Sequence, residues 1–211
     1  MNTRVIMVAA SLLALSGCAS VPGAAPTGAP DEAAWQLRRT QLEKLVDWEL
    51  QGRVGIINGK DGGSGSMDWK QQGDVLAFSF RGPFGAGSLQ VQGDAHALWV
   101  RSSRGDDFIT TDPEQDFSRR LRIPLPVLSM RYWMLGLPDP TAPFTKSVDA
   151  HGHLVTLVQR GWQVDYQDYA SFKGYDLPTR LLIERASVRI KVAVNNWQLD
   201  PDKHQSSASV Q

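Results

Sequence analysis

The residue best suited to covalent chemistry in this chain is Cys18, its only cysteine, which follows Leu15, Ser16 and Gly17. A single cysteine cannot form a disulfide within the chain, and in an exported protein it would otherwise be an exposed thiol. We therefore expect the Cys18 thiol to be consumed by covalent modification.

The segment before Cys18 indicates what that modification is. Arg4 precedes an apolar run over residues 5–15, about 16 Å long as a helix. That length is roughly half a bilayer core, which is typical of a signal peptide and too short for a membrane span. We predict a signal peptide over residues 1–17. The alternative is an ordinary signal peptide cleaved near Ala19.

Small residues followed by a lone cysteine resemble a bacterial lipobox, in which the cysteine is diacylated, becomes the first residue after cleavage and is N-acylated. Three acyl chains would anchor the protein stably. In lipoproteins of enteric bacteria, an Asp after the lipidated residue is associated with inner-membrane retention. Here that position is Ala19, so the resemblance implies a lipid-anchored protein at the periplasmic face of the outer membrane.

Other chemistry has little support in the sequence. No Gly-x-Ser-x-Gly motif is present, so a serine nucleophile has no local signature. His151 and His153 flank a glycine in what we interpret as a solvated hairpin turn rather than a metal site. The glycine-rich residues 82–87 lack the lysine and helix of a phosphate-binding loop. We predict no enzymatic activity, no metal and no cofactor.

Charge also narrows the function. The chain has 22 basic and 22 acidic residues, a balance that gives no electrostatic reason to expect a nucleic-acid partner.

The pattern along the chain predicts one domain over residues 31–199, after a flexible tether over residues 18–30 that is rich in Pro, Gly and Ala. A helix is predicted from Asp31 through Trp35 toward Glu49. A polar tail over residues 200–211 is expected to be disordered.

Within the domain, alternating apolar residues predict about eleven short antiparallel strands, which indicates a mainly β barrel or strongly curved sheet. Helices predicted over residues 112–121 and 127–135 interrupt the strands and must cover one opening or face. Their apolar residues are candidates for a lid: Phe117, Leu121, Val127, Leu128 and Trp133.

The chain contains seven tryptophans. They either fill the core of a β protein or, in a half-open barrel, leave part of an apolar lining free for a ligand. The sequence does not separate these readings. The candidates for such a lining are Trp48, Leu50, Trp69, Phe78, Phe80 and Trp99.

Phe84 has a different setting. It lies between Pro83 and Gly85, where a turn is expected between two strands. Exposed bulky apolar residues on loops often mark contact surfaces, so Pro83, Phe84 and Gly85 form a candidate membrane-contact loop. The alternative is that the ring folds back over the mouth of the barrel.

Taken together, these segments resemble the LolB family of outer-membrane lipoprotein receptors over nearly the whole chain after the signal peptide. Besides the lipobox and Trp35, the resemblance rests on Gly52-Arg53 and on residues 69–74, 82–85, 125–126, 132–138, 161–166, 177–178 and 190–197.

The resemblance implies an incomplete antiparallel β-barrel of eleven strands, with a helical lid over an apolar cavity. It also implies a monomer that accepts lipoproteins from the periplasmic carrier LolA by binding their acyl chains, then inserts them into the outer membrane. Family members carry an exposed apolar loop residue, usually Leu, that matches Phe84. The alternative is a structural or assembly lipoprotein that binds a protein partner through a filled β domain.

Overall fold

The computed structural model describes residues 31–199. The predicted signal peptide, Cys18, the tether and the polar tail lie outside the described residues.

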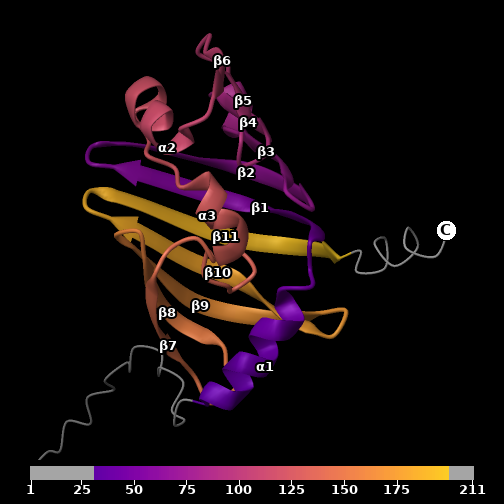
Figure 1. Ribbon diagram of the computed structural model, residues 1–211. Coiled ribbons are helices and arrows are strands. Elements are labelled where there is room, and N and C mark those ends of the chain that lie inside the picture. The colour runs from indigo at the N-terminus through magenta and orange to yellow at the C-terminus, as the bar shows by residue number, and fades with distance from the viewer. Residues whose placement is uncertain (1–30, 200–211) are drawn as a thin grey trace, which may run out of the picture.

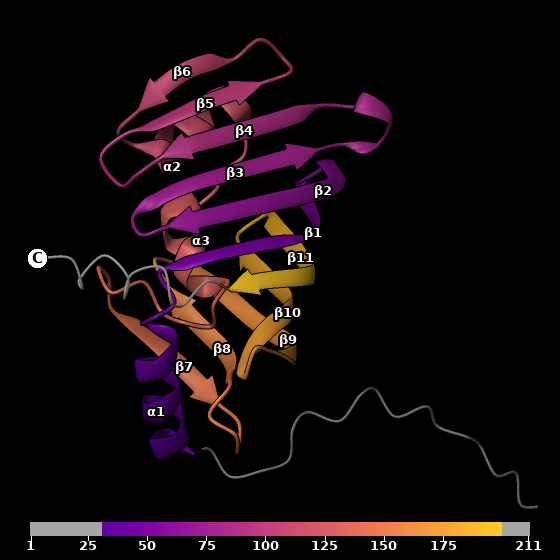
Figure 2. The ribbon, with the colours of Figure 1, turned by 90° about the vertical axis from the view of Figure 1, so that its right-hand side faces the viewer.

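Eleven strands form one antiparallel sheet in the order β6-β5-β4-β3-β2-β1-β11-β10-β9-β8-β7 (Figure 2). The sheet is not closed, because β6 and β7 are its two edges. The predicted fold, an incomplete antiparallel barrel, is confirmed. The strands are β1 (Asp47–Asn58), β2 (Asp61–Gln72), β3 (Val75–Arg81), β4 (Ser88–Gly93), β5 (Leu98–Ser102), β6 (Asp107–Thr110), β7 (Phe144–Val148), β8 (Leu154–Gln159), β9 (Trp162–Phe172), β10 (Tyr175–Arg185) and β11 (Val188–Leu199).

Alternation of side chains gives the sheet one apolar inner face. In β11, Val188, Ile190 and Val192 are buried while the residues between them are more exposed. Such alternation is what a half-buried strand requires. A register shift at Gln51/Gly52, where β1 pairs with β11, marks a bulge. An extra residue there bends the strand and increases its twist, which helps to curve the sheet.

The helices are short. They are α1 (Glu32–Leu42), the one-turn η1 (Pro83–Gly85), α2 (Pro113–Asp116), η2 (Phe117–Leu121) and α3 (Val127–Trp133). Figure 1 shows α2 and α3 on the inner side of the curved sheet. Among residues 31–199, no helix is long and apolar enough to cross a membrane.

The first helix is shorter than predicted. It ends at Leu42, and Glu49 belongs to β1 rather than to a helical face. Asp31 caps its start, accepting a hydrogen bond from the Ala34 amide at 2.9 Å. Trp35 is completely buried.

The turn between β7 and β8 is solvated only in part: His151 is exposed, as predicted, but Gly152 is buried against α1. A Cβ on Gly152 would lie 2.5 Å from the Trp35 amide nitrogen, so only glycine permits this contact. His153 stacks on Tyr169 with ring centroids 4.4 Å apart. Its Nδ1 lies 3.2 Å from an oxygen of Asp149. The histidine therefore fixes the turn against Tyr169 of β9.

Candidate functional site

The inner face is not equally filled along the sheet. We call β7–β11 with α1 and α3 the sealed half, and β1–β6 with α2 and η2 the open half. In the sealed half, inward side chains such as Leu157, Val164 and Ile183 have no exposed surface. In the open half, several apolar side chains remain only partly buried against the core, and we call them the apolar strip: Ile56, Phe80, Leu89, Phe108 and Leu121.

Members of the apolar strip are neighbours across strands. Phe80 of β3 pairs with Leu89 of β4, so their side chains lie side by side on the inner face. Phe108 lies on the edge strand β6. The strip therefore runs across several strands, with apolar surface left uncovered.

Glycines in β2 leave room beside this strip. Gly65 allows the Phe80 ring to pack against the backbone, because a Cβ there would lie 2.7 Å from Phe80 Cε2. Gly63 faces the same side two residues earlier, and a Cβ on it would meet nothing within 4 Å. No role is predicted for these glycines from the sequence. The signal that could have indicated one is glycine at two alternate positions of one strand, 63 and 65.

Most of the residues predicted to line a cavity are instead packed inside the core. Trp48, Leu50 and Trp69 face inward but are nearly fully buried. The Trp48 ring centroid lies 5.3 Å from that of Trp197 and 5.8 Å from that of Trp69. These residues form a packed aromatic cluster, and the partly buried Phe78 joins it at 5.5 Å from Trp69. Of the predicted lining, only Phe78 and Phe80 keep exposed inner surface.

Trp99 does not belong with the other predicted lining residues. In β5 the alternation places Leu98 and Val100 in the core, with exposed fractions of 1% and 0%. Trp99 therefore points to the outer face, where its Nε1 donates a hydrogen bond to Asp107 at 2.7 Å. The Arg101 guanidinium lies 4.6 Å from the Trp99 ring centroid. The prediction that Trp99 lines the interior was wrong.

The predicted lid residues fall into two groups. Phe117, Val127 and Trp133 are buried in the core, whereas Leu121 and Leu128 are only partly buried. The expected helix over residues 112–121 is present as α2 and η2, and the second expected helix ends at Trp133.

Buried hydrogen bonds fix α3 in place. Trp133 Nε1 donates to Gln159 Oε1 at 2.9 Å, and the same oxygen accepts the Asp139 amide at 2.8 Å. Gln159 Nε2 in turn donates to the carbonyls of Asp139 and Ala142. The Tyr166 hydroxyl donates to the Trp133 carbonyl at 3.0 Å. Such a satisfied polar network rigidifies its surroundings.

Asp139 adds an ionic contact to this network. Burial of its carboxylate would raise its pKa, but hydrogen bonds from Thr141 and Ser129 and the charge of Arg160 outweigh that effect and lower the pKa below its ordinary value. The carboxylate thus stays charged and ties α3 to the turn after β8.

Fewer polar contacts hold α2 and η2. Glu114 forms an ion pair with Arg185 of β10. The Asn58 side chain donates to the Arg122 carbonyl at 2.9 Å, and the Arg120 guanidinium lies 4.4 Å from the Phe108 ring centroid. These contacts lie near the surface, where ion pairs contribute little to stability.

The loop between β3 and β4 presents Phe84 to solvent. Its side chain is fully exposed, at 109% of the reference value. Phe84 has φ 51° and ψ 28°, a left-handed conformation that is unfavourable for residues other than glycine. Backbone hydrogen bonds from Gly82 to Gly87 (2.8 Å) and from Ala86 to Pro83 (2.9 Å) hold the turn. Figure 2 shows the turn projecting at the end of β3 and β4.

Comparison with known proteins gives a consistent result. The sequence model of the family described as "Outer membrane lipoprotein LolB" matches residues 46–197. The chain is 34% identical to the outer-membrane lipoprotein LolB of Nitrosococcus oceani, over 93% of this chain and 98% of that protein. It is 33% identical to the LolB of Alkalilimnicola ehrlichii, over 94% and 98%.

Solved structures support the fold. A DUF1329 family protein from Desulfovibrio piger superimposes with a TM-score of 0.51 at 10% identity, covering 86% of this chain and 99% of that one. A domain of a putative outer-membrane lipoprotein-sorting protein from Vibrio parahaemolyticus gives a TM-score of 0.50 at 8% identity, covering 83% and 96%.

The match covers most of the described domain and the relatives match over nearly their full length. The chain therefore belongs to the LolB family: it is an outer-membrane lipoprotein anchored at the periplasmic face, and a receptor for lipoproteins rather than an enzyme.

Proposed function

We propose that client lipoproteins, delivered by the periplasmic carrier LolA, place their acyl chains against the apolar strip before they enter the outer membrane. The observation that carries this proposal is the contrast between the halves. The apolar strip of the open half is partly uncovered, whereas the central inward side chains of the sealed half, such as Leu157, Val164 and Ile183, are completely buried. The partly buried apolar side chains of the sealed half include Phe144 of β7 and Tyr169 of β9. Acylated Cys18 and the tether over residues 18–30 would keep the domain close to the membrane.

The acyl chains of a lipoprotein must be shielded from water because their exposure costs a large free energy. Three acyl chains of roughly fifteen methylenes each, at about 0.8 kcal/mol per methylene, cost tens of kcal/mol to expose to water. Transfer without nucleotide hydrolysis then requires each acceptor to bind the chains more favourably than the donor before it. An apolar surface that is only partly covered suits a transient acceptor.

In this proposal α2 and η2 act as the lid, and α3 stays in place. Apart from the buried Phe117 ring, α2 and η2 are held by an ion pair, one hydrogen bond and one cation–π contact near the surface. In contrast, α3 is tied to β8 and β9 by the buried Gln159 network. Leu121 on η2 belongs to the apolar strip, so displacement of η2 would uncover more of it.

Phe84 acts in delivery. Its exposure on a projecting turn suits insertion of the ring into the lipid interface, where aromatic side chains are favourable. The loop joins β3 and β4, the two strands that carry Phe80 and Leu89. The membrane contact would therefore lie at the end of the strands that hold the client.

The test separates acceptance from delivery. We expect Phe84→Glu to accept lipoproteins from LolA but to fail to incorporate them into liposomes, because a carboxylate must be desolvated to enter the interface. Phe84→Leu, the matched control, should do both. Acceptance is measured by pull-down of the loaded receptor, and incorporation by flotation. Normal incorporation by Phe84→Glu would refute the membrane-contact role.

A further inference from the structure

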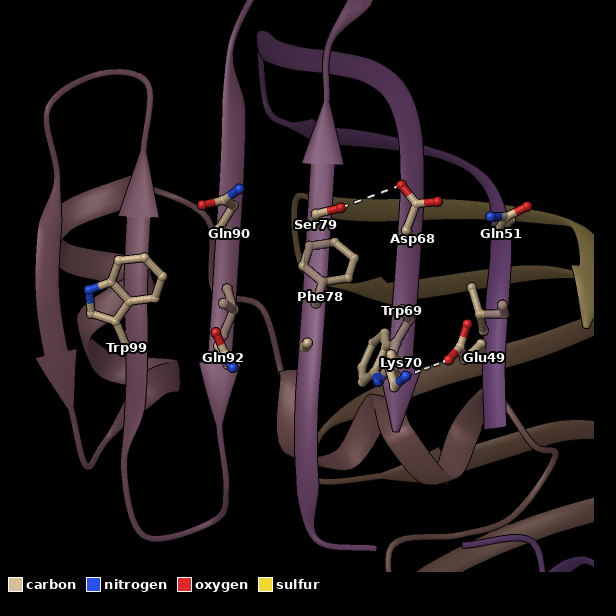
Figure 3. A pocket seen from close by; sticks show the side chains of 13 residues that line it. Glu49, Gln51, Asp68, Trp69, Lys70, Phe78, Ser79, Gln90, Gln92 and Trp99 are labelled. Carbon is tan, nitrogen blue, oxygen red and sulfur yellow. Dashed lines mark hydrogen bonds and ion pairs between the residues drawn. The ribbon is translucent and has the colours of Figure 1, made fainter. Parts of the chain in front are cut away.

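The outer face of the open half carries a hollow of about 260 Å³ (Figure 3). It spans β1 to β5, on the opposite side of the sheet from the apolar strip. Ala77 of β3 lies in its middle, between Lys70 of β2 and Gln92 of β4 in the register of the sheet. A methyl group flanked by two long side chains leaves the floor of the hollow uncovered.

Three carboxamides border this hollow: Gln51, Gln90 and Gln92. All three side chains are exposed, and within residues 31–199 none of them has a protein hydrogen-bond partner. Each carboxamide offers two N–H donors and one carbonyl acceptor. The hollow thus presents several free polar groups of both kinds.

The charged groups around the hollow are already neutralised by one another. Glu49 pairs with Lys70 at 2.8 Å, and Asp68 pairs with Arg81. A charged ligand would therefore meet no uncompensated charge of opposite sign among these side chains. The complementary ligand is uncharged and polar.

An indole stands at the end of the hollow away from Gln51, as Figure 3 shows for Trp99. The hydrogen bond to Asp107 and the Arg101 contact fix its orientation. The same hydrogen bonds, from Arg101 first and from Trp99, lower the pKa of Asp107. The Arg101 guanidinium lies over one face of the indole, and the part of the ring that stays exposed offers apolar contact area in a fixed position at little cost in conformational entropy.

We propose that this hollow binds an uncharged oligosaccharide, and specifically the N-acetylated glycan of the cell wall. A sugar ring combines an apolar C–H face, which can lie against the indole, with hydroxyl and acetamido groups that match free carboxamides. The domain is anchored at the periplasmic face of the outer membrane, where this glycan is within reach. Such contact would position the receptor between membrane and wall.

This site is independent of the acyl-chain proposal, because it uses the other face of the sheet. Ala77→Leu fills the hollow and removes no polar contact of the structure. Trp99→Ala removes the indole instead. Thr145→Leu, at an exposed position on β7, is the matched control for added apolar bulk.

The experiment uses the full lipidated chain in detergent. Tri-N-acetylchitotriose is titrated by calorimetry, and purified cell-wall sacculi are used for co-sedimentation. We expect saturable binding of both probes by the unaltered chain and by Thr145→Leu. Ala77→Leu and Trp99→Ala should each weaken binding about tenfold, with lipoprotein acceptance unchanged in both and the melting temperature unchanged in Ala77→Leu.

Two results would overturn the proposal. One is the absence of saturable binding of either probe by the unaltered chain. The other is binding that both Ala77→Leu and Trp99→Ala leave intact. Association with anionic phospholipid vesicles that Ala77→Leu weakens, without sugar binding, would instead assign the hollow to lipid headgroups and refute the glycan.

Discussion

The two halves of the sheet carry similar apolar residues on their inner faces but bury them to different extents. In the sealed half, Val164 and Ile183 are completely buried, and the side-chain oxygen and nitrogen of Gln159 are both hydrogen-bonded. In the open half, Phe80 and Leu89 keep exposed surface beside glycines of β2. The same alternation of apolar residues thus produces a packed support in one half and, in our proposal, the surface for acyl chains in the other.

The difference lies in what covers each inner face. The sealed half is covered by α3 and braced by α1, both tied to it by specific contacts. The open half is covered by α2 and η2, which are held by the buried Phe117 ring and by a few polar contacts near the surface. Apolar content alone does not distinguish a core from a binding surface; the packing partners do.

The largest effect should follow from breaking the sealed half. Gln159→Leu removes four hydrogen bonds, three of them buried, and leaves Trp133 Nε1 and the Asp139 amide unpaired. At about 1–3 kcal/mol for each unsatisfied group, the free energy of unfolding should fall by about 4 kcal/mol. Urea unfolding measures it. The exposed Gln163→Leu on β9 should change it by less than about 0.5 kcal/mol.

A smaller effect, on binding rather than stability, should follow from filling the open half. Gly63→Trp places an indole where no atom lies within 4 Å of the added Cβ. We expect acceptance of lipoproteins to fall about tenfold with little change in melting temperature. Ser64→Trp points to the outer face and is the control. Equal acceptance by the two variants would show that the apolar strip is not the client surface.

The smallest effect should come from tethering the lid. Glu114→Cys with Arg185→Cys, joined by a short bismaleimide, ties α2 to β10 where the two side chains now pair. Acceptance should slow severalfold. The same linker between Arg131→Cys and Asp74→Cys, which replaces another ion pair, ties α3 to the sheet and should change nothing. A slowing by the α3 linker alone would assign the gate to α3.

Much of this architecture could be predicted from the sequence. Strands with strict alternation, such as β11, were found because a period of two is unambiguous. The exposure of Phe84 followed from its flanking Pro83 and Gly85. Trp99 was misplaced because an aromatic residue in a strand is expected inside. Leu98, Trp99 and Val100 are consecutive apolar residues, so the sequence does not indicate which of them face inward. In the structure Leu98 and Val100 do, and Trp99 faces outward.

The apolar strip itself could not be predicted. Whether Phe80 or Trp69 keeps exposed surface depends on which helix lies above it, and that is decided by contacts far apart in sequence. Asn58 holds the carbonyl of Arg122, for example. Gly63 and Gly65 have no side chain, so no hydrophobic pattern marks them. They matter because they leave room beside the apolar strip.

The most direct test places a photoreactive phenylalanine analogue at either of two phenylalanines and exposes the receptor to a client with labelled acyl chains. Phe80 lies in the open half and Phe144 in the sealed half, and both are partly buried. The account predicts crosslinks to the acyl chains from position 80 and none above background from position 144. Equal crosslinking at both positions, or crosslinking at position 144 alone, would contradict it.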